Sequence, residues 1–257
     1  MSRALILMYH SVDQPLNAAE ARYCVTPAAF RQQMIHLAAP GRVVMPLATL
    51  VQTLKQGNQL HDNTVAVTFD DGFECFRRNA LPILTEFNIP ATLFAVSGKP
   101  GGSNTWMQAK GWPERRLMNA HELRDIQAAG VTVGCHALSH RPMTQLRDEE
   151  LVDETAGARR ILSDTLGTDV TLFAYPHGAQ GERERQAVAQ AGFIAACGTE
   201  PGFNRYQTDL FALRRIDVYG GDTLASFRRK LQFGANQVAW GDLARYYLNR
   251  ITTRFHG

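Results

Sequence analysis

Short apolar, β-prone runs alternate with segments of helical periodicity along most of this sequence, and this alternation restricts the folds that the chain can adopt. Eight runs are expected to form strands: residues 4–8, 43–45, 65–69, 92–96, 131–135, 171–174, 193–197 and 213–218. Helix-period segments lie between most of them. Because strand–helix–strand units place successive strands in parallel, the pattern predicts an α/β fold with a parallel sheet.

Capping residues mark three of the expected helix starts, at Thr26–Pro27, Asn119–Glu122 and Asp148. The third of these helices is expected to continue to Gly167. The least regular stretch, residues 97–113, contains SGKPGGSN and two tryptophans, and we predict a long loop on one rim of the sheet. Loops of this kind often carry substrate contacts on an α/β scaffold.

The composition is that of an ordinary globular chain. It has 257 residues, of which 45% are hydrophobic and 20% are charged, and this length suits a single domain over residues 1–257. These values exclude a disordered, a collagen-like or a small disulfide-rich protein. The formal net charge of +3 is too small to indicate binding to nucleic acid. The four cysteines form no CxxC pair, so we expect buried thiols.

The sequence contains no apolar run near the roughly 18 residues that a membrane-spanning helix needs, so we expect no integral membrane segment. The start of the chain, MSRALILMYHSV, lacks the apolar core and cleavage site of a signal peptide. We therefore expect a cytoplasmic chain, or one whose leader had been removed. The sequence leaves the oligomeric state open.

Ionisable or polar residues follow four of the expected strands. His10 follows the first, Asp70 and Asp71 follow the run at 65–69, and His136 follows the run at 131–135. Tyr175 and two further residues of YPH follow the run at 171–174. Because the carboxyl ends of parallel strands meet at one rim, these side chains are expected to lie close together.

Two of these segments have the composition of a metal site. In VTFDDG, adjacent carboxylates on an extended backbone would point in different directions, so that one could bind a metal while the other faces a substrate. In HALSH, His136 and His140 are four residues apart, which allows two imidazoles to converge on one cation. The alternatives are a solvated Asp-Asp-Gly turn and an accidental histidine pair.

The segment FAYPHG combines a proline that fixes the backbone with Gly178, which permits a sharp turn. Such a turn could direct a backbone N–H at an oxyanion. An ordinary strand-to-helix turn is the alternative.

Six motifs in this order resemble the polysaccharide deacetylases of carbohydrate esterase family 4, the NodB homology domain: MYHSV, TPAAFRQQM, VTFDDG, LPILTEFNIPATLF, GCHALSH and FAYPHG. The resemblance extends from about Leu5 to about Val218. It is strongest to the branch that deacetylates poly-N-acetylglucosamine, in which the motifs are permuted. It implies a distorted, NodB-like (β/α) barrel of seven to eight mostly parallel strands.

The resemblance also implies a metal site and its ligands. Asp71, His136 and His140 would hold a divalent metal, most often zinc. Asp70 would be the general base, and the histidine of MYHSV, His10, would be the general acid.

The resemblance also implies roles for residues in the C-terminal part of the chain. Arg215 would orient the base carboxylate. Tyr175, Pro176 and His177 would form the oxyanion and substrate segment, with the His177 backbone N–H facing the oxyanion.

Three positions depart from the family pattern. Ala137 replaces a Ser or Thr whose hydroxyl braces the loop, Ala174 stands where many relatives have an arginine, and His177 replaces a commoner aromatic residue. If His10 lay far from Asp70, His177 would be the next candidate for the acid.

The implied activity is hydrolysis of N-acetyl groups on an N-acetylglucosamine-containing polysaccharide or oligosaccharide, with release of acetate. One alternative is a carbohydrate-binding relative without turnover, which Ala137 would favour. Another is a hydrolase for an acetylated xylan, peptidoglycan, an acylated glycolipid or a small amide.

Two basic segments remain. FRRK at 227–230 is interpreted as a solvated helix face. Residues 240–255 are interpreted as the last helix of the barrel, a membrane-surface helix or a contact with a second chain.

Overall fold

A computed structural model describes residues 3–237 of the chain. Within this range the main sheet has eight strands: β1 (Ala4–Tyr9), β4 (Val43–Val44), β5 (Thr64–Phe69), β6 (Ala91–Ala95), β7 (Thr132–Cys135), β8 (Leu172–Ala174), β9 (Ala195–Cys197) and β10 (Ile216–Asp217). Each expected strand is confirmed, with ends that differ by at most three residues. A second, two-stranded sheet joins β2 (Ser11–Val12) to β3 (Cys24–Val25).

The strands of the main sheet all pair in parallel, in the order β10-β1-β5-β6-β7-β8-β9, with β4 beside β5. An isolated parallel bridge between Cys197 and Leu213 draws β9 toward the segment that leads into β10. In the register of β1 and β5, Tyr9 lies opposite Phe69. The residues that follow these two strands therefore emerge side by side.

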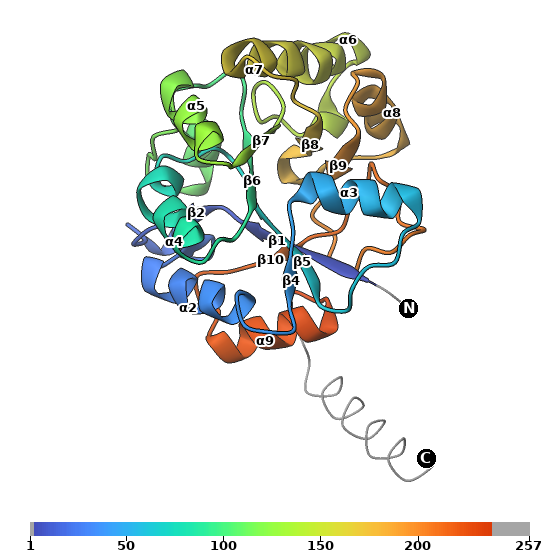
Figure 1. Cartoon of the computed structure of the whole chain (residues 1–257). Coiled ribbons are helices and arrows are strands. Elements are labelled where there is room, and N and C mark those ends of the chain that lie inside the picture. Colours follow the sequence, from blue (N-terminus) through green and yellow to red (C-terminus); the bar gives the residue numbers. More distant parts are fainter. Residues whose placement is uncertain (1–2, 238–257) are drawn as a thin grey trace.

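Helices surround the strands (Figure 1). The α-helices are α1 (Ala18–Ala21), α2 (Pro27–Leu37), α3 (Leu47–Gln56), α4 (Leu81–Glu86), α5 (Ala120–Ala128), α6 (Asp148–Val152), α7 (Ala158–Leu166), α8 (Glu182–Gln190) and α9 (Leu224–Phe233). The described residues also form two π-helical turns, η1 (Phe76–Ala80) and η4 (Asp153–Gly157). They form three 3-10 turns as well: η2 (Thr105–Lys110), η3 (Met143–Gln145) and η5 (Pro176–Gly178). None of the helices between residues 3 and 237 is both long and apolar enough to cross a bilayer.

Both faces of the sheet are buried. Leu5 and Leu7 of β1 belong to the larger core beneath α2, α5 and α7, whereas Ala4 and Ile6 pack in a second core with α3. Because successive side chains of a strand point to opposite faces, burial on both sides requires the continuous apolar runs found in the sequence.

Two of the three expected helix starts are capped as the sequence predicts, whereas Asp148 is the first residue of α6 and Arg147 occupies the N-cap position. Thr26 accepts the N–H of Ala29 at the start of α2, and Asn119 and Glu122 form a reciprocal capping box on α5. The helix expected from Asp148 is interrupted by the π-helical turn η4, which periodicity alone did not indicate. The rim loop at 97–113 contains η2, and the segment 240–255 lies outside the described residues.

Candidate active site

A cavity of about 290 Å³ opens at the carboxyl ends of the strands, where the sequence predicts the functional residues. Its lining brings together these predicted residues: His10, Asp70, Asp71, His136, His140, Tyr175 and His177. Pro176 is buried and is not among the residues that line this cavity. Segments more than 160 residues apart in sequence thus meet at one rim.

His10 and Asp70 are neighbours because β1 and β5 are paired. The Asp70 N–H donates to the Tyr9 carbonyl at 2.9 Å, which continues the ladder one step beyond the strands. His10 is half-buried, and its ring lies 5.0 Å from that of Tyr23. The alternative in which His10 lies far from Asp70 does not apply.

Asp71 lines the same cavity, but its backbone conformation differs from the extended one expected from the sequence. Its φ of 74° is left-handed, not extended, and Gly72 follows with a φ of 81°. The sharp turn sends both carboxylates to the rim. A left-handed conformation costs a non-glycine residue free energy, and Asp tolerates it better than most.

The three predicted metal ligands form a compact, buried cluster. One donor atom from each of Asp71, His136 and His140 lies within 4.8 Å of the others. His140 Nε2 is 3.1 Å from Asp71 Oδ1, and His136 Nε2 is 3.5 Å from the same oxygen. That oxygen is buried and forms no hydrogen bond of acceptable geometry with any described residue.

The hydrogen bonding of His136 indicates what belongs between these atoms. Its Nδ1 is 2.7 Å from the Ala174 carbonyl, and a carbonyl only accepts, so Nδ1 carries the proton. In the neutral ring, Nε2 then directs a lone pair at the carboxylate of Asp71. Lone pairs that face each other repel unless a proton or a metal ion lies between them. Two imidazole nitrogens beside a buried carboxylate oxygen that forms no hydrogen bond therefore fit a divalent metal.

The charge states of Asp71 and His140 agree with this interpretation. Burial alone would raise the pKa of Asp71, but its contacts with His136 and His140 outweigh burial and hold the pKa well below the usual value. Burial lowers the pKa of His140, which favours the neutral ring that a metal ligand requires. Burial alone would lower the pKa of His136, but the charge of Asp70 and the contacts with Asp71 raise it, so a metal at Nε2 would take the place of a proton there.

The loop from His136 to His140 contains two left-handed residues, Ala137 at φ 59° and His140 at φ 64°. Glu154, buried on η4, braces it: Oε2 accepts the N–H groups of Leu138 and Ser139 at 2.8 and 2.9 Å. The Ser139 hydroxyl donates to Oε1. Glu154 therefore braces this loop although Ala137 lacks the hydroxyl of the family pattern.

Arg215 lies behind Asp70 and does not line the cavity. Its guanidinium donates to both carboxylate oxygens, at 2.6 and 2.7 Å, and to the Gly198 carbonyl at 2.8 Å. Both side chains are almost completely buried. Burial alone would raise the pKa of Asp70, but the charge and hydrogen bonds of Arg215, together with the charges of His136 and His10, outweigh burial, so the pKa is lowered and the carboxylate stays ionised.

The FAYPHG segment turns sharply at His177, whose φ is 58°. The Tyr175 hydroxyl donates to the Phe211 carbonyl at 3.0 Å, and the His177 ring lies edge-on to that of His140 at 4.6 Å. Gly178 also has a positive φ, and a Cβ there would lie 2.1 Å from the Thr199 hydroxyl oxygen. Only glycine fits this turn.

Residues 57–196 match the sequence profile of the family described as Polysaccharide deacetylase, which is more than half of the chain. The chain belongs to the polysaccharide deacetylase family. The prediction of a deacetylase hydrolase made from the sequence motifs is confirmed at the level of this family.

Two relatives of this polysaccharide deacetylase share about a quarter of the aligned residues with it. YxkH of Bacillus subtilis (strain 168), whose name places it among polysaccharide deacetylases, is 23% identical over 222 residues, which cover 86% of this chain and 74% of YxkH. Poly-beta-1,6-N-acetyl-D-glucosamine N-deacetylase of Staphylococcus aureus (strain MSSA476) is 23% identical over 179 residues, 66% of this chain. The match spans 59% of the staphylococcal protein.

Among solved structures, the Streptococcus pyogenes deacetylase PplD in complex with acetate superposes with a TM-score of 0.75. It is 22% identical, and the alignment covers 90% of this chain and 98% of PplD. At this identity the similarity shows the fold, and it confirms the distorted, mostly parallel (β/α) barrel.

The deacetylase cavity also contains residues that the sequence analysis did not single out. Trp106 stacks on His140 with ring centroids 4.4 Å apart and planes 17° apart. Trp112 and Tyr23 form an aromatic wall near His10, and Asp217 lines the cavity from the end of β10. The two tryptophans belong to the rim loop predicted to carry substrate contacts, but the loop's path could not be deduced from its glycine-rich sequence.

Proposed function

We propose that this polysaccharide deacetylase is a metal-dependent hydrolase that removes N-acetyl groups from an N-acetylglucosamine-containing glycan and releases acetate. The observation that carries the proposal is the Asp71–His136–His140 cluster, placed in one cavity with the arginine-bound carboxylate of Asp70 and with His10. Two comparisons support it: a staphylococcal relative is named for this substrate, and PplD was solved with acetate.

Asp71, His136 and His140 would hold the metal, and zinc suits one carboxylate with two imidazoles. Three protein ligands leave coordination positions open, as in catalytic sites. When bound there, the metal would act as a Lewis acid toward the acetamide oxygen and acidify a water molecule.

The chain's own residues would then move the protons. Asp70, ionised and fixed by Arg215, takes a proton from the attacking water as its oxygen bonds to the carbonyl carbon. The His177 backbone N–H donates to the carbonyl oxygen as negative charge develops on it. His10 donates a proton to the amide nitrogen as the C–N bond breaks, because an amine anion is a poor leaving group.

The aromatic side chains that line the cavity favour a sugar as the substrate. Trp106, Trp112 and Tyr23 offer flat apolar faces of the kind that pack against a sugar ring, beside the polar catalytic groups.

The metal requirement predicts a reversible loss of activity. We expect acetate release from N-acetylglucosamine oligomers, with β-1,4 and β-1,6 linkages tested separately, to stop after treatment with a chelator. Zinc, cobalt or nickel should restore it, because deprotonation of water near neutral pH depends on the metal. Protein that remains inert toward every acetylated glycan after metal addition contradicts the proposal, and activity that survives complete metal removal contradicts the metal's role.

Glu154 provides a prediction about metal affinity. We expect Glu154→Ala to weaken zinc binding roughly 10- to 100-fold, because the Leu138 and Ser139 N–H groups lose their acceptor and His140 is no longer held in place. Competition with a chromophoric chelator measures this affinity directly. Glu149→Ala removes an exposed carboxylate from the neighbouring α6 and should leave the affinity unchanged. Equal affinity in both variants would show that the brace is dispensable.

A further inference from the structure

A second polar cavity, of about 440 Å³, lies between α2 and α9 at the amino ends of β1 and β5. Arg3, His36, Arg42 and Arg228 contribute the charged or titratable side chains of its lining. The catalytic residues follow the carboxyl ends of the same six-residue strands, so the two cavities are separated by about 20 Å of sheet.

The basic side chains reach this cavity from separate segments. Arg3 precedes β1, Arg42 precedes β4, and Arg228 lies on α9. The Arg3 guanidinium lies over the Phe203 ring, 3.7 Å from its centroid. Arg42 Nη2 is 2.8 Å from His36 Nε2, and because a guanidinium only donates, His36 accepts and is neutral.

Within residues 3–237, no carboxylate compensates these charges. None of the residues that line the cavity is acidic, and Arg3, Arg42 and Arg228 form no ion pair with a described residue. Elsewhere on the surface, arginines such as Arg116 pair with carboxylates, here Glu122. The neighbouring cavity beneath Tyr219 contains Asp222, which pairs with Lys230.

Electrostatics in the cavity are therefore repulsive. Burial and then the charge of Arg228 lower the pKa of Arg42. Burial, followed by the charges of Arg42 and Arg228, lowers the pKa of His36. A bound anion would relieve this repulsion and would pair with guanidinium N–H groups that have no acceptor among the described residues.

We propose that this cavity binds a phosphoryl group, carried by a small molecule or by a lipid headgroup. Guanidinium groups bind phosphate oxygens through paired N–H donors, and three of them approaching from different segments suit a tetrahedral dianion. The volume leaves room for more than phosphate itself. The FRRK run, interpreted from sequence as a solvated helix face, is in fact divided: Phe227 and Lys230 are buried, while Arg228 is exposed beside the cavity.

Calorimetric titration of the full-length, metal-loaded protein tests the proposal. The probes are inorganic phosphate, N-acetylglucosamine 1-phosphate, and phosphatidylcholine vesicles with or without phosphatidic acid. We expect saturable binding of at least one phosphoryl probe, weakened roughly tenfold or more by Arg42→Gln and by Arg228→Gln. Binding of the soluble probes identifies a small molecule, and binding confined to vesicles with phosphatidic acid identifies a lipid headgroup; either supports the proposal.

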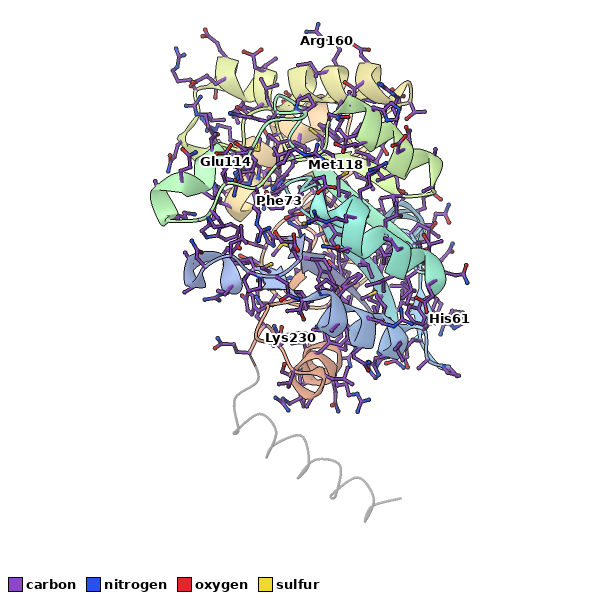
Figure 2. All side chains as sticks on the ribbon, turned by 90° about the vertical axis from the view of Figure 1, so that its left-hand side faces the viewer. His61, Phe73, Glu114, Met118, Arg160 and Lys230 are labelled. Atoms are coloured by element: carbon purple, nitrogen blue, oxygen red, sulfur yellow. The ribbon has the colours of Figure 1, made fainter. Side chains whose placement is uncertain are left out.

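A matched control is Arg160→Gln, which removes the same charge from an exposed position on α7. Figure 2 shows Arg160 on the opposite side of the molecule from α9, where Lys230 is labelled. Its binding should equal that of the unchanged protein. Thermal unfolding of each variant without probe establishes that it is folded.

Phosphate could also bind at the metal cluster, so the titration is repeated with Asp71→Asn. Binding that persists in this variant and remains sensitive to Arg42→Gln supports a separate site. Three results overturn the proposal: no saturable binding of any probe, equal weakening by Arg160→Gln, or loss of binding in Asp71→Asn.

Discussion

Replacement of Asp70 by Asn is expected to lower kcat by roughly 10²- to 10⁴-fold while the protein still binds its metal. Asn has nearly the same shape as Asp but cannot take a proton from water. Asp70 is not part of the metal cluster: its carboxylate lines the cavity and is held by Arg215, which lies behind it. Kinetics of acetate release, together with metal content by atomic absorption, measure the two effects separately.

The neighbouring substitution Asp71→Asn is the matched control, because it makes the same chemical change one residue away. It removes the anionic ligand from between His136 and His140, so both metal content and activity should be lost. Excess zinc should restore part of the activity of Asp71→Asn and none of that of Asp70→Asn. If Asp70→Asn kept its activity, or if both variants lost metal equally, the two carboxylates would not have the separate roles assigned to them.

The sequence predicts the fold and most of the proposed site because both depend on local patterns. Continuous apolar runs specify buried parallel strands, and the ionisable residues at their carboxyl ends must then meet at one rim. His10 and Asp70 illustrate this, since the pairing of β1 with β5 is sufficient to bring them together.

Other parts of the site depend on backbone conformation, which these patterns do not encode. Four of the six left-handed non-glycine residues described, Asp71, Ala137, His140 and His177, lie at this rim. Strained residues of this kind persist only where surrounding contacts hold them. Glu154 supplies such contacts from a π-helical turn, and neither that turn nor its partners could be recognised from helical periodicity.

The Glu154 brace also bears on the alternative of a carbohydrate-binding relative without turnover. That alternative depends on Ala137, which lacks the bracing hydroxyl of the family pattern. Since Leu138 and Ser139 are held by Glu154 instead, Ala137 alone gives no reason to expect a loosened metal loop.

The buried pair of Arg215 and Asp70 leads to a large predicted effect on stability. We expect Arg215→Met to reduce the free energy of unfolding by roughly 3–5 kcal/mol, because it leaves the Asp70 carboxylate buried without a counter-charge. Asp70→Asn should also destabilise the protein, since it leaves the Arg215 guanidinium unpaired. Its kinetics must therefore be measured well below its unfolding temperature.

A double-mutant cycle separates the ion pair from the other contacts of Arg215. The Met substitution also removes hydrogen bonds to the Gly198 carbonyl and the Thr68 hydroxyl, but this loss is the same with Asp or Asn at position 70 and cancels in the cycle. The double variant leaves no charge unpaired, so it should be more stable than the sum of the single effects by about 2 kcal/mol or more. Urea unfolding of the four proteins gives these values. Additive effects would mean that Arg215 serves mainly to hold Gly198 and Thr68, and Asp70 would then need another source for its fixed orientation.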